Sequence, residues 1–256
     1  MKTLMINAHP DFKKEDSFSF KLKEMFLEAY GQLYPNEQLE VLNLYDIQLP
    51  RIEKNQLLNV WHKQREGEKL SEVEELISTK TSELLQQFKA YKRIVIISPL
   101  HNFNITSRLK DYIDNIMIAR ETFKYTESGS VGLMTDNYKA LYLQASGSIY
   151  TNDDRYKLLD FSYHYLKAMF EDIMGFEEFY VVRAQGTAIL PENDILNDAK
   201  LDLKQVLTTG QIWEEEQLEK YYNQSENINK RVILRNQMRI NSDETTFNWI
   251  RNLIDN

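Results

Sequence analysis

The sequence of 256 residues contains no cysteine, only four histidines, five prolines and eight glycines. The lack of cysteine excludes disulfides, thiolate zinc sites, iron–sulfur clusters and cysteine nucleophiles. The four histidines are scattered and have no paired acidic spacing, so the sequence predicts no metal site. Chemistry on this chain must therefore use few of the usual catalytic side chains, or depend on a cofactor.

Basic side chains are also in the minority, with 31 lysines and arginines against 39 aspartates and glutamates, a net charge of -8. Nucleic acid and anionic membranes attract basic surfaces, so neither is a predicted partner. The most apolar run, Ile94–Ile97, is far shorter than the roughly 20 residues of a membrane helix. Asn7, His9 and Asp11 interrupt the start before the apolar core of a signal peptide could form. We expect a globular, cytoplasmic protein.

Short aliphatic or β-branched runs alternate with helical patterns. The five predicted strands are Thr3–Ala8, Gln38–Leu44, Arg93–Ser98, Lys139–Ala145 and Glu178–Ala184. The third is apolar at consecutive positions, as in a strand buried on both faces, whereas the second and fifth are mixed, as near an edge. Apolar residues at helical spacing predict the helices Ser17–Tyr30, Leu70–Tyr91, Thr106–Ala119, Tyr156–Met174 and Asp194–Leu207, with Gly31 and Gly175 as two of the ends. This alternation predicts an α/β fold with a doubly wound parallel sheet.

Two regions depart from the alternation. Glu121–Leu133, with Phe123 and Tyr125 followed by Ser128-Gly129, predicts a hairpin. After the last predicted helix no strand signal remains, and helical patterns cover Trp213–Tyr222, Ile228–Met238 and Phe247–Ile254. We therefore predict one domain over residues 1–209 and a helical C-terminal extension over residues 210–256, packed on the domain or across a dimer. The basic residues of that extension are predicted to flank apolar anchors rather than to bind nucleic acid.

In a doubly wound sheet, the ligand site lies beyond the carboxyl ends of the strands. The loop after the first strand has no glycine, so neither the dinucleotide turn GxGxxG nor the phosphate loop GxxxxGK[ST] is present. Ser17 and Ser19 stand at the start of the next helix. They either cap that helix or, with its free N–H groups and dipole, bind a phosphate. His9 is either a further phosphate donor or a structural residue of the turn.

The loops after the third and fourth strands carry two further candidates. Pro99–Ile105 is either a simple strand-to-helix connection with Asn104 or Thr106 as cap, or a platform for a flat ligand. Ala145–Ser148 offers small residues and a glycine, which let backbone amides approach a ligand closely. The GxSxG spacing is absent, which excludes the nucleophile elbow of a serine hydrolase.

Three segments in register resemble a known family. Asn7-Ala8-His9-Pro10 followed by Ser17-Phe18-Ser19 resembles the first phosphate loop of the flavodoxin-like NAD(P)H quinone reductases. Ser98–Ile105, with Leu109–Asp114 behind it, is similar to the flavin loop of the FMN-dependent NADH azoreductases. Thr122–Leu133 matches that family's TFxYTExGxxGL segment. The matches are collinear over roughly residues 1–190, and the shorter family has no counterpart for Gln211–Asn256.

The resemblance implies a flavodoxin-like sheet with strand order 2-1-3-4-5 and a homodimer with FMN bound near the subunit interface. It assigns the phosphate end of FMN to His9, Ser17, Phe18 and Ser19. It assigns the isoalloxazine ring to Pro99, Leu100, His101, Asn102 and Phe103, and the pyrimidine edge of that ring to Ala145, Ser146, Gly147 and Ser148. The sequence departs from the family at His101, where Tyr is usual, and at Ser146 and Ser148, where Arg and Gly are common.

The resemblance also implies an activity that suits the sparse catalytic inventory, because the flavin carries the chemistry. NADH or NADPH would transfer hydride to flavin N5, and a small quinone or azo compound would then take the electrons in a ping-pong cycle. Amides of Asn102, Phe103 and Gly147 would stabilise the ring, and Phe103 and Tyr125 would pack against it. No side chain is assigned as a certain catalyst, and His101 and Tyr125 are candidates for positioning.

Two alternatives stay open at this point. One is a quinone reductase that does not reduce azo compounds and holds FMN or FAD. The other is a non-catalytic flavodoxin-like electron carrier or a redox-sensing partner protein. The predicted hairpin and the C-terminal extension favour a closed, dimeric enzyme over a small electron carrier.

Overall fold

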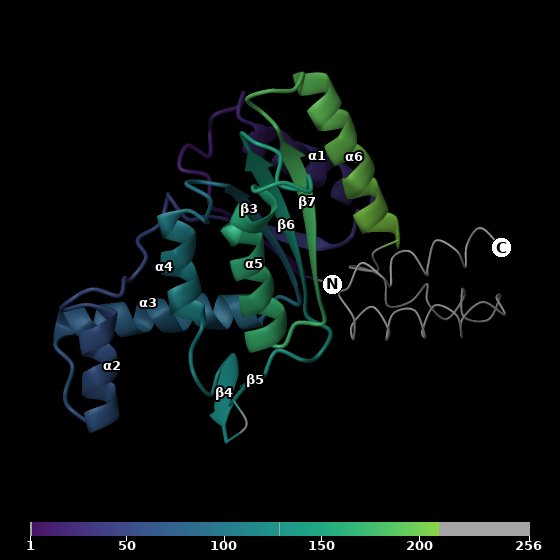
Figure 1. The fold of residues 1–256 in the computed structure, drawn as a ribbon. Coiled ribbons are helices and arrows are strands. Elements are labelled where there is room, and N and C mark those ends of the chain that lie inside the picture. The colour runs from purple at the N-terminus through teal and green to yellow at the C-terminus, as the bar shows by residue number, and fades with distance from the viewer. Residues whose placement is uncertain (1, 128, 210–256) are drawn as a thin grey trace. The chain divides into compact units, whose positions relative to one another are not determined.

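The computed structural model describes residues 2–127 and 129–209 (Figure 1). The predicted helical extension over residues 210–256, with its three predicted helical segments, lies outside the described residues. Among the described helices, none is long and apolar enough to cross a membrane.

A parallel sheet of five strands forms the centre of the fold. Its strands lie in the order β2-β1-β3-β6-β7, which is 2-1-3-4-5 when they are counted within the sheet, as predicted. Every predicted strand is present, and each end lies within one residue of its predicted position. The strands are β1 (Lys2–Asn7), β2 (Gln38–Asn43), β3 (Arg93–Pro99), β6 (Lys139–Ser146) and β7 (Glu178–Gln185).

Helices cover both faces of the sheet, as right-handed connections between parallel strands require (Figure 1). In the central strand β3, Ile94 and Ile96 belong to the core on one face and Val95 and Ile97 to the core on the other, and all four are buried. The first face packs against α3 (Glu72–Lys89), α4 (Ser107–Ile116) and α5 (Phe161–Lys167). The second packs against α1 (Phe18–Leu33) and α6 (Glu192–Thr209).

The edge strands β2 and β7 have mixed burial, as their sequences predicted. One helix, α2 (Leu57–Glu66), was not predicted, because only Leu57 and Val60 of its residues are buried. A polar contact attaches it to α3, since Asn59 and Lys63 both donate to the carboxylate of Glu74. The hydrogen bond from Lys63 and the backbone N–H of Ser71 lower the pKa of Glu74 to about 2.

The predicted end of the first helix at Gly31 is wrong, because α1 continues to Leu33. Tertiary contacts carry the helix past the glycine. The Tyr30 hydroxyl lies 3.1 Å from the Thr3 hydroxyl on β1, and the Tyr34 hydroxyl donates to the Leu207 carbonyl at 3.1 Å. These contacts outweigh the roughly 1 kcal/mol that a glycine costs inside a helix.

The helix predicted over Tyr156–Met174 is divided into three pieces. A 3₁₀ turn, η1 (Lys157–Leu159), precedes α5, and a π-helical turn, η2 (Ala168–Ile173), follows it. Asp160 causes the first break, because its side chain caps α5 by accepting the N–H of Tyr163 at 3.0 Å. In the π-helical turn, the buried ring of Phe170 meets Phe88 at 6.1 Å and Phe176 at 5.0 Å. Gly175, as predicted, ends this segment, with a φ of 89°.

The predicted hairpin is present as β4 (Phe123–Thr126) and β5 (Gly129–Gly132), which pair antiparallel. It lies at the amino ends of β6 and β7, where Met134 N–H donates to the Met174 carbonyl at 2.8 Å (Figure 1). Its base is tight, since a Cβ on Gly132 would come within 2.4 Å of the Gly175 nitrogen. Only glycine at position 132 therefore lets the hairpin sit against the chain that leads into β7.

Two tyrosines in the same core have opposite hydrogen-bonding states. Tyr142 on β6 donates toward the Ser98 carbonyl at 3.4 Å and lies 3.3 Å from the Ser162 hydroxyl. Tyr112 on α4 is 1% exposed, and its hydroxyl has no hydrogen-bond partner among the described residues. A buried hydroxyl without a partner loses its hydration and gains nothing in return.

We predict that Tyr112→Phe raises the free energy of unfolding by about 1 kcal/mol, because the variant removes an unsatisfied buried hydroxyl. The matched variant Tyr142→Phe should lower the free energy of unfolding by about 1 kcal/mol, since it leaves buried partners without their hydrogen bond. Urea unfolding of the wild type and both variants measures the two changes. Destabilisation of the same size in both variants would show that Tyr112 has a partner.

Candidate functional site

Hydrogen bonds join the three candidate loops at one edge of the sheet. The loops follow β1, β3 and β6, which are neighbours in the sheet, so their carboxyl ends meet. Ala8 N–H donates to the Ile97 carbonyl at 2.7 Å, and the Thr106 hydroxyl donates to the Ala8 carbonyl at 3.1 Å. Leu100 N–H donates to the Ala145 carbonyl at 2.8 Å. The structure therefore brings together the predicted residues of all three loops.

The first loop ends in a helix N-terminus with an unsatisfied hydroxyl. Ser17 is the N-cap of α1 and accepts the Phe20 N–H at 3.2 Å, which confirms the capping interpretation for this residue. Ser19 is 2% exposed, and its Oγ has no hydrogen-bond partner among the described residues. The first turn of α1 contains no acidic residue, so no side chain of the helix occupies the positive end of its dipole. This arrangement fits a phosphate, which would accept from Ser19 and from N–H groups such as that of Phe18.

His9 supports the same interpretation through its protonation. The backbone N–H of His9 donates to Asn7 Oδ1 at 3.1 Å, and the ring Nδ1 accepts the backbone N–H of Asp11 at 3.1 Å. Burial lowers the pKa of His9, so the ring is held in its neutral form with the proton on Nε2. His9 is therefore both a structural residue of the turn and a possible donor through Nε2, which joins the two interpretations left open by the sequence.

The second loop contains a tight turn that presents Asn102 and Phe103. His101 N–H donates to the Asn104 carbonyl at 2.8 Å, and Asn104 N–H donates to the His101 carbonyl at 3.0 Å. The two central residues have φ values of 47° and 66°, as in a type I′ turn. Such backbone costs energy at Phe103 and is characteristic of functional turns. The N–H groups of Asn102 and Phe103 are used by no other group in the described part of the chain.

Thr106 takes the N-cap position of α4, but its hydroxyl donates to the Ala8 carbonyl and does not accept a backbone N–H of the helix. The exposed side chain of Asn104 accepts the Ile105 N–H through its Oδ1 at 2.8 Å. The loop is thus more than a capped connection. His101, Asn102 and Phe103 are all exposed at its tip, while Pro99 and Leu100 are half-buried behind them.

The third loop offers two further N–H groups. The carbonyls of Ser146, Gly147 and Ser148 accept from the turn after β7, with donors at Thr187, Ala188 and Gly186, each at 3.1 Å. This pairing uses the carbonyl side of the loop and leaves the N–H groups of Gly147 and Ser148 without a partner among the described residues. Ser146 Oγ donates to the Ser148 carbonyl at 2.9 Å. The loop can therefore donate hydrogen bonds to a carbonyl or an anion.

The structure adds a residue that the sequence did not predict, Tyr150. It is 7% exposed, and its ring meets Phe103 edge-on at 6.5 Å and Tyr156 edge-on at 5.8 Å. It therefore links the second loop to the third. No sequence pattern predicts the contact between these two rings, because Tyr150 follows β6 and Phe103 follows β3.

A buried polar network lies beneath the third loop. Gln144, next to Ala145, donates to the Asp160 carboxylate at 2.8 Å and to the Ser162 hydroxyl at 2.9 Å. Arg183 on β7 donates to Gln144 Oε1 at 3.0 Å and to Asp160 at 3.3 Å. The Asp160 carboxylate accepts from both Gln144 and Arg183, and this network anchors the end of β6. No sequence pattern predicts this network, since its members come from two strands and the start of a helix.

Tyr125 is not brought together with the other predicted residues. It is 74% exposed on the hairpin, which lies at the amino ends of the strands (Figure 1). The three loops lie at the carboxyl ends, and the eight residues of β6 span roughly 25 Å at about 3.3 Å each. Tyr125 is therefore remote from the three loops of its own chain.

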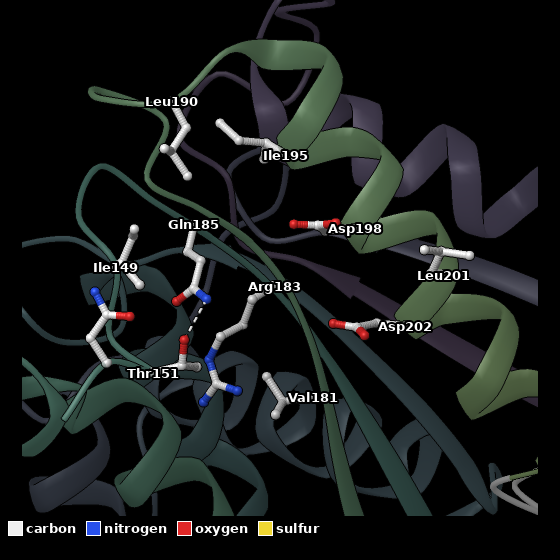
Figure 2. Close-up of a pocket in the computed structure, with 11 residues that line it drawn as sticks. Ile149, Thr151, Val181, Arg183, Gln185, Leu190, Ile195, Asp198, Leu201 and Asp202 are labelled. Carbon is white, nitrogen blue, oxygen red and sulfur yellow. Dashed lines mark hydrogen bonds between the residues drawn. The ribbon is translucent and has the colours of Figure 1, made fainter.

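A cavity of about 420 Å³ lies behind the third loop, between β7, α6 and residues 149–152 (Figure 2). Figure 2 shows Gln185 bonded to Thr151 beside it and two carboxylates, Asp198 and Asp202, on the α6 wall. Burial and the neighbouring Asp198 raise the pKa of Asp202. No cluster of metal-ligating side chains occurs within residues 2–127 and 129–209.

Known proteins match most of this chain. A family model described as "Flavodoxin-like fold" matches residues 1–207. The FMN-dependent NADH:quinone oxidoreductase 1 of Lactiplantibacillus plantarum is 53% identical over 205 residues, which cover 79% of this chain and 95% of that protein. The FMN-dependent NADH:quinone oxidoreductase of Streptococcus agalactiae is 52% identical over 206 residues, 80% of this chain and 96% of that protein.

A second family model, the Schlafen group 3 DNA/RNA helicase domain, matches residues 199–256. Most of these residues lie outside the described part of the chain, and the match is too short a part of the sequence to show a family.

Among solved structures, a crystal structure of an FMN-dependent NADH-azoreductase from Bacillus anthracis in complex with FMN has a TM-score of 0.77 and 51% identity. The match covers 80% of this chain and 96% of that chain. Sequence identity and fold similarity thus extend over the whole sheet and its three loops. The chain belongs to the flavodoxin-like family of the FMN-dependent NADH:quinone oxidoreductases, as its three sequence segments predicted.

Proposed function

We propose that this protein is an FMN-dependent oxidoreductase that uses NADH to reduce quinones and azo compounds. One observation carries the proposal, the unsatisfied Ser19 hydroxyl at the N-terminus of α1. It lies on the same sheet edge as four N–H groups that have no partner among the described residues, those of Asn102, Phe103, Gly147 and Ser148. When bound, FMN would supply the redox chemistry, two-electron transfer from NADH to the acceptor.

The residues of the chain would bind and orient this cofactor. Ser19, the Phe18 N–H and His9 Nε2 would donate to the phosphate, with Ser17 fixing the start of α1. The turn at Asn102 and Phe103 would donate to polar atoms of the ring, and the Phe103 ring would cover a flat acceptor. The N–H groups of Gly147 and Ser148 would stabilise negative charge at the pyrimidine edge, because unpaired amides are preorganised donors. The loops need no side chain as a proton donor, since water can reach exposed His101 and Asn102.

We also infer that the protein acts as a homodimer in the cytoplasm. Tyr125 supports the dimer, because it is 74% exposed and lies roughly 25 Å along β6 from the loops. The hairpin of a second copy could supply Tyr125 to the site, where an exposed aromatic ring would pack against the acceptor. The compartment follows from the proposed reductant, NADH, and cell fractionation tests it.

We predict that the purified protein binds one FMN per chain and oxidises NADH with menadione as acceptor. Flavin released by heat and identified by chromatography, together with absorbance at 340 nm, measures both. Ser19→Ala is the diagnostic variant. It should raise the Kd for FMN by about 10- to 100-fold, because a hydrogen bond to a charged group is lost. The apoprotein of the same variant should be slightly more stable, since an unsatisfied hydroxyl is removed.

Weaker FMN binding together with a more stable apoprotein distinguishes a lost ligand contact from a damaged fold. A protein that takes up no FMN, even at high concentration, would refute the proposed function. A protein that binds FMN but oxidises no NADH would instead be an electron carrier. Unchanged FMN affinity in Ser19→Ala would place the phosphate elsewhere.

We predict that Gly147→Ala weakens FMN binding by about tenfold without loss of apoprotein stability. A Cβ on Gly147 would meet only the Ala188 Cβ, at 3.8 Å, so the fold itself has room for it. The added Cβ would collide with the edge of the flavin ring if the Gly147 amide approaches that edge closely. Fluorescence titration of FMN and thermal unfolding measure the two quantities. Gly31→Ala, on an exposed part of α1 with nothing within 4 Å, is the control and should bind FMN normally.

We predict that the protein sediments as a dimer and that Tyr125→Ala lowers kcat/KM for menadione by about 3- to 10-fold, the loss expected for one aromatic contact. Its FMN content and thermal stability should stay at the wild-type level, because the side chain is 74% exposed. Analytical ultracentrifugation at the assay concentration, with steady-state kinetics, makes the test. A fully active monomer would contradict the inferred dimer.

A further inference from the structure

Within residues 2–127 and 129–209, Tyr150 is the one buried ring that joins the two loops assigned to the flavin ring. It follows Gly147 and Ser148 in the third loop, and its own side chain is 7% exposed. Its ring meets the ring of Phe103 at 6.5 Å and 71°, an edge-to-face contact. The roles proposed above for Gly147 and Phe103 do not require a buried aromatic ring at position 150.

The position of Phe103 makes this contact important. Phe103 has a φ of 66°, in the left-handed region that bulky residues rarely adopt, and its side chain is 41% exposed. An exposed ring on a two-residue turn has rotational freedom unless a neighbour restricts it. Tyr150 supplies that restriction from the buried side, and the ring of Tyr156 supports Tyr150 in turn at 5.8 Å.

Gln185 holds Tyr150 in place from the end of β7. Its Oε1 accepts the Tyr150 N–H at 3.0 Å. Its Nε2 donates to the Thr151 hydroxyl at 2.7 Å, the hydrogen bond drawn in Figure 2. The cavity of about 420 Å³ lies between this segment and α6. The two hydrogen bonds of Gln185 therefore fix the backbone that carries Tyr150.

We propose that Tyr150 is a positioning residue of the flavin site, whose ring sets the orientation of the Phe103 ring toward a flat acceptor. The inference rests on the proposed function for the identity of the ligand. The ring acts rather than the hydroxyl, since the Tyr150 hydroxyl makes no hydrogen bond within the described part of the chain. Burial raises the pKa of Tyr150, so the hydroxyl also stays protonated across the working range of pH.

The test compares Tyr150→Ala with Tyr150→Phe in the holoenzyme. Tyr150→Ala should lower kcat/KM for menadione by about 3- to 10-fold, mainly through a higher KM, because one edge-to-face pair is lost. Tyr150→Phe keeps the ring and should retain wild-type kinetics. Gln185→Ala should produce a smaller change in the same direction, whereas Asn152→Ala should have no effect. Asn152 lines the same cavity and forms no side-chain hydrogen bond with the described residues.

A second measurement uses the apoprotein and no flavin. In protein with labelled phenylalanine, the ring signals of Phe103, assigned from Phe103→Leu, should shift in Tyr150→Ala and stay in place in Tyr150→Phe. Tyr138→Ala is the control for lost packing. Its ring is half-buried and meets Phe176 at 5.3 Å at the other end of the sheet, so its removal should lower stability but leave these signals unchanged.

Two results would overturn the proposal. Wild-type kinetics and unchanged Phe103 signals in Tyr150→Ala would show that the ring does not position Phe103. An equal loss in Tyr150→Phe would assign the effect to the hydroxyl. A wild-type protein that binds no FMN would refute the proposed function, while the Phe103 signals would still decide whether Tyr150 orients that ring.

Discussion

Burial of β3 on both faces is the constraint on which the rest of the structure depends. Its alternating apolar residues face two separate cores, so helices must cover both sides of the sheet. This requirement makes every connection a crossover, and crossovers bring the carboxyl ends of β1, β3 and β6 to one edge. The three loops at that edge share hydrogen bonds, such as that from Leu100 to the Ala145 carbonyl. The candidate site is thus a consequence of how the core is buried.

Polar groups in this protein follow a pattern that separates support from binding. Beneath the loops, Gln144, Asp160 and Arg183 satisfy one another in a closed network. At the same edge of the sheet, the buried hydroxyl of Ser19 and the N–H groups of the exposed residues Asn102 and Gly147 have no partner among the described residues. A buried donor such as Ser19 is costly without a partner, and a ligand that accepts from it offsets that cost. The satisfied network below keeps the unsatisfied donors above in fixed positions.

Much of the candidate site could be predicted because its residues follow strand ends directly in the sequence. Ser17, Asn102 and Gly147 each stand in the loop after a strand whose apolar pattern is plain. The role of Tyr150 could not be predicted, since it depends on contact with the ring of Phe103, which follows a different strand. Gly31 was predicted to end α1, and the contacts of Tyr30 with Thr3 and of Tyr34 with the Leu207 carbonyl override that local preference. The break at Asp160 depends likewise on the network that captures its carboxylate.

The sequence by itself determined the five strands of the sheet, most of the helices between them, the absence of cysteine chemistry, and the loops in which a ligand could bind. Periodicity carries this information, because each strand or helix must present its apolar residues to a core. Only the tertiary structure decided which donors remain free, that Tyr150 contacts Phe103, and that Tyr125 lies at the far end of the sheet. These depend on contacts between residues distant in the chain, and local patterns do not record which strand ends become neighbours.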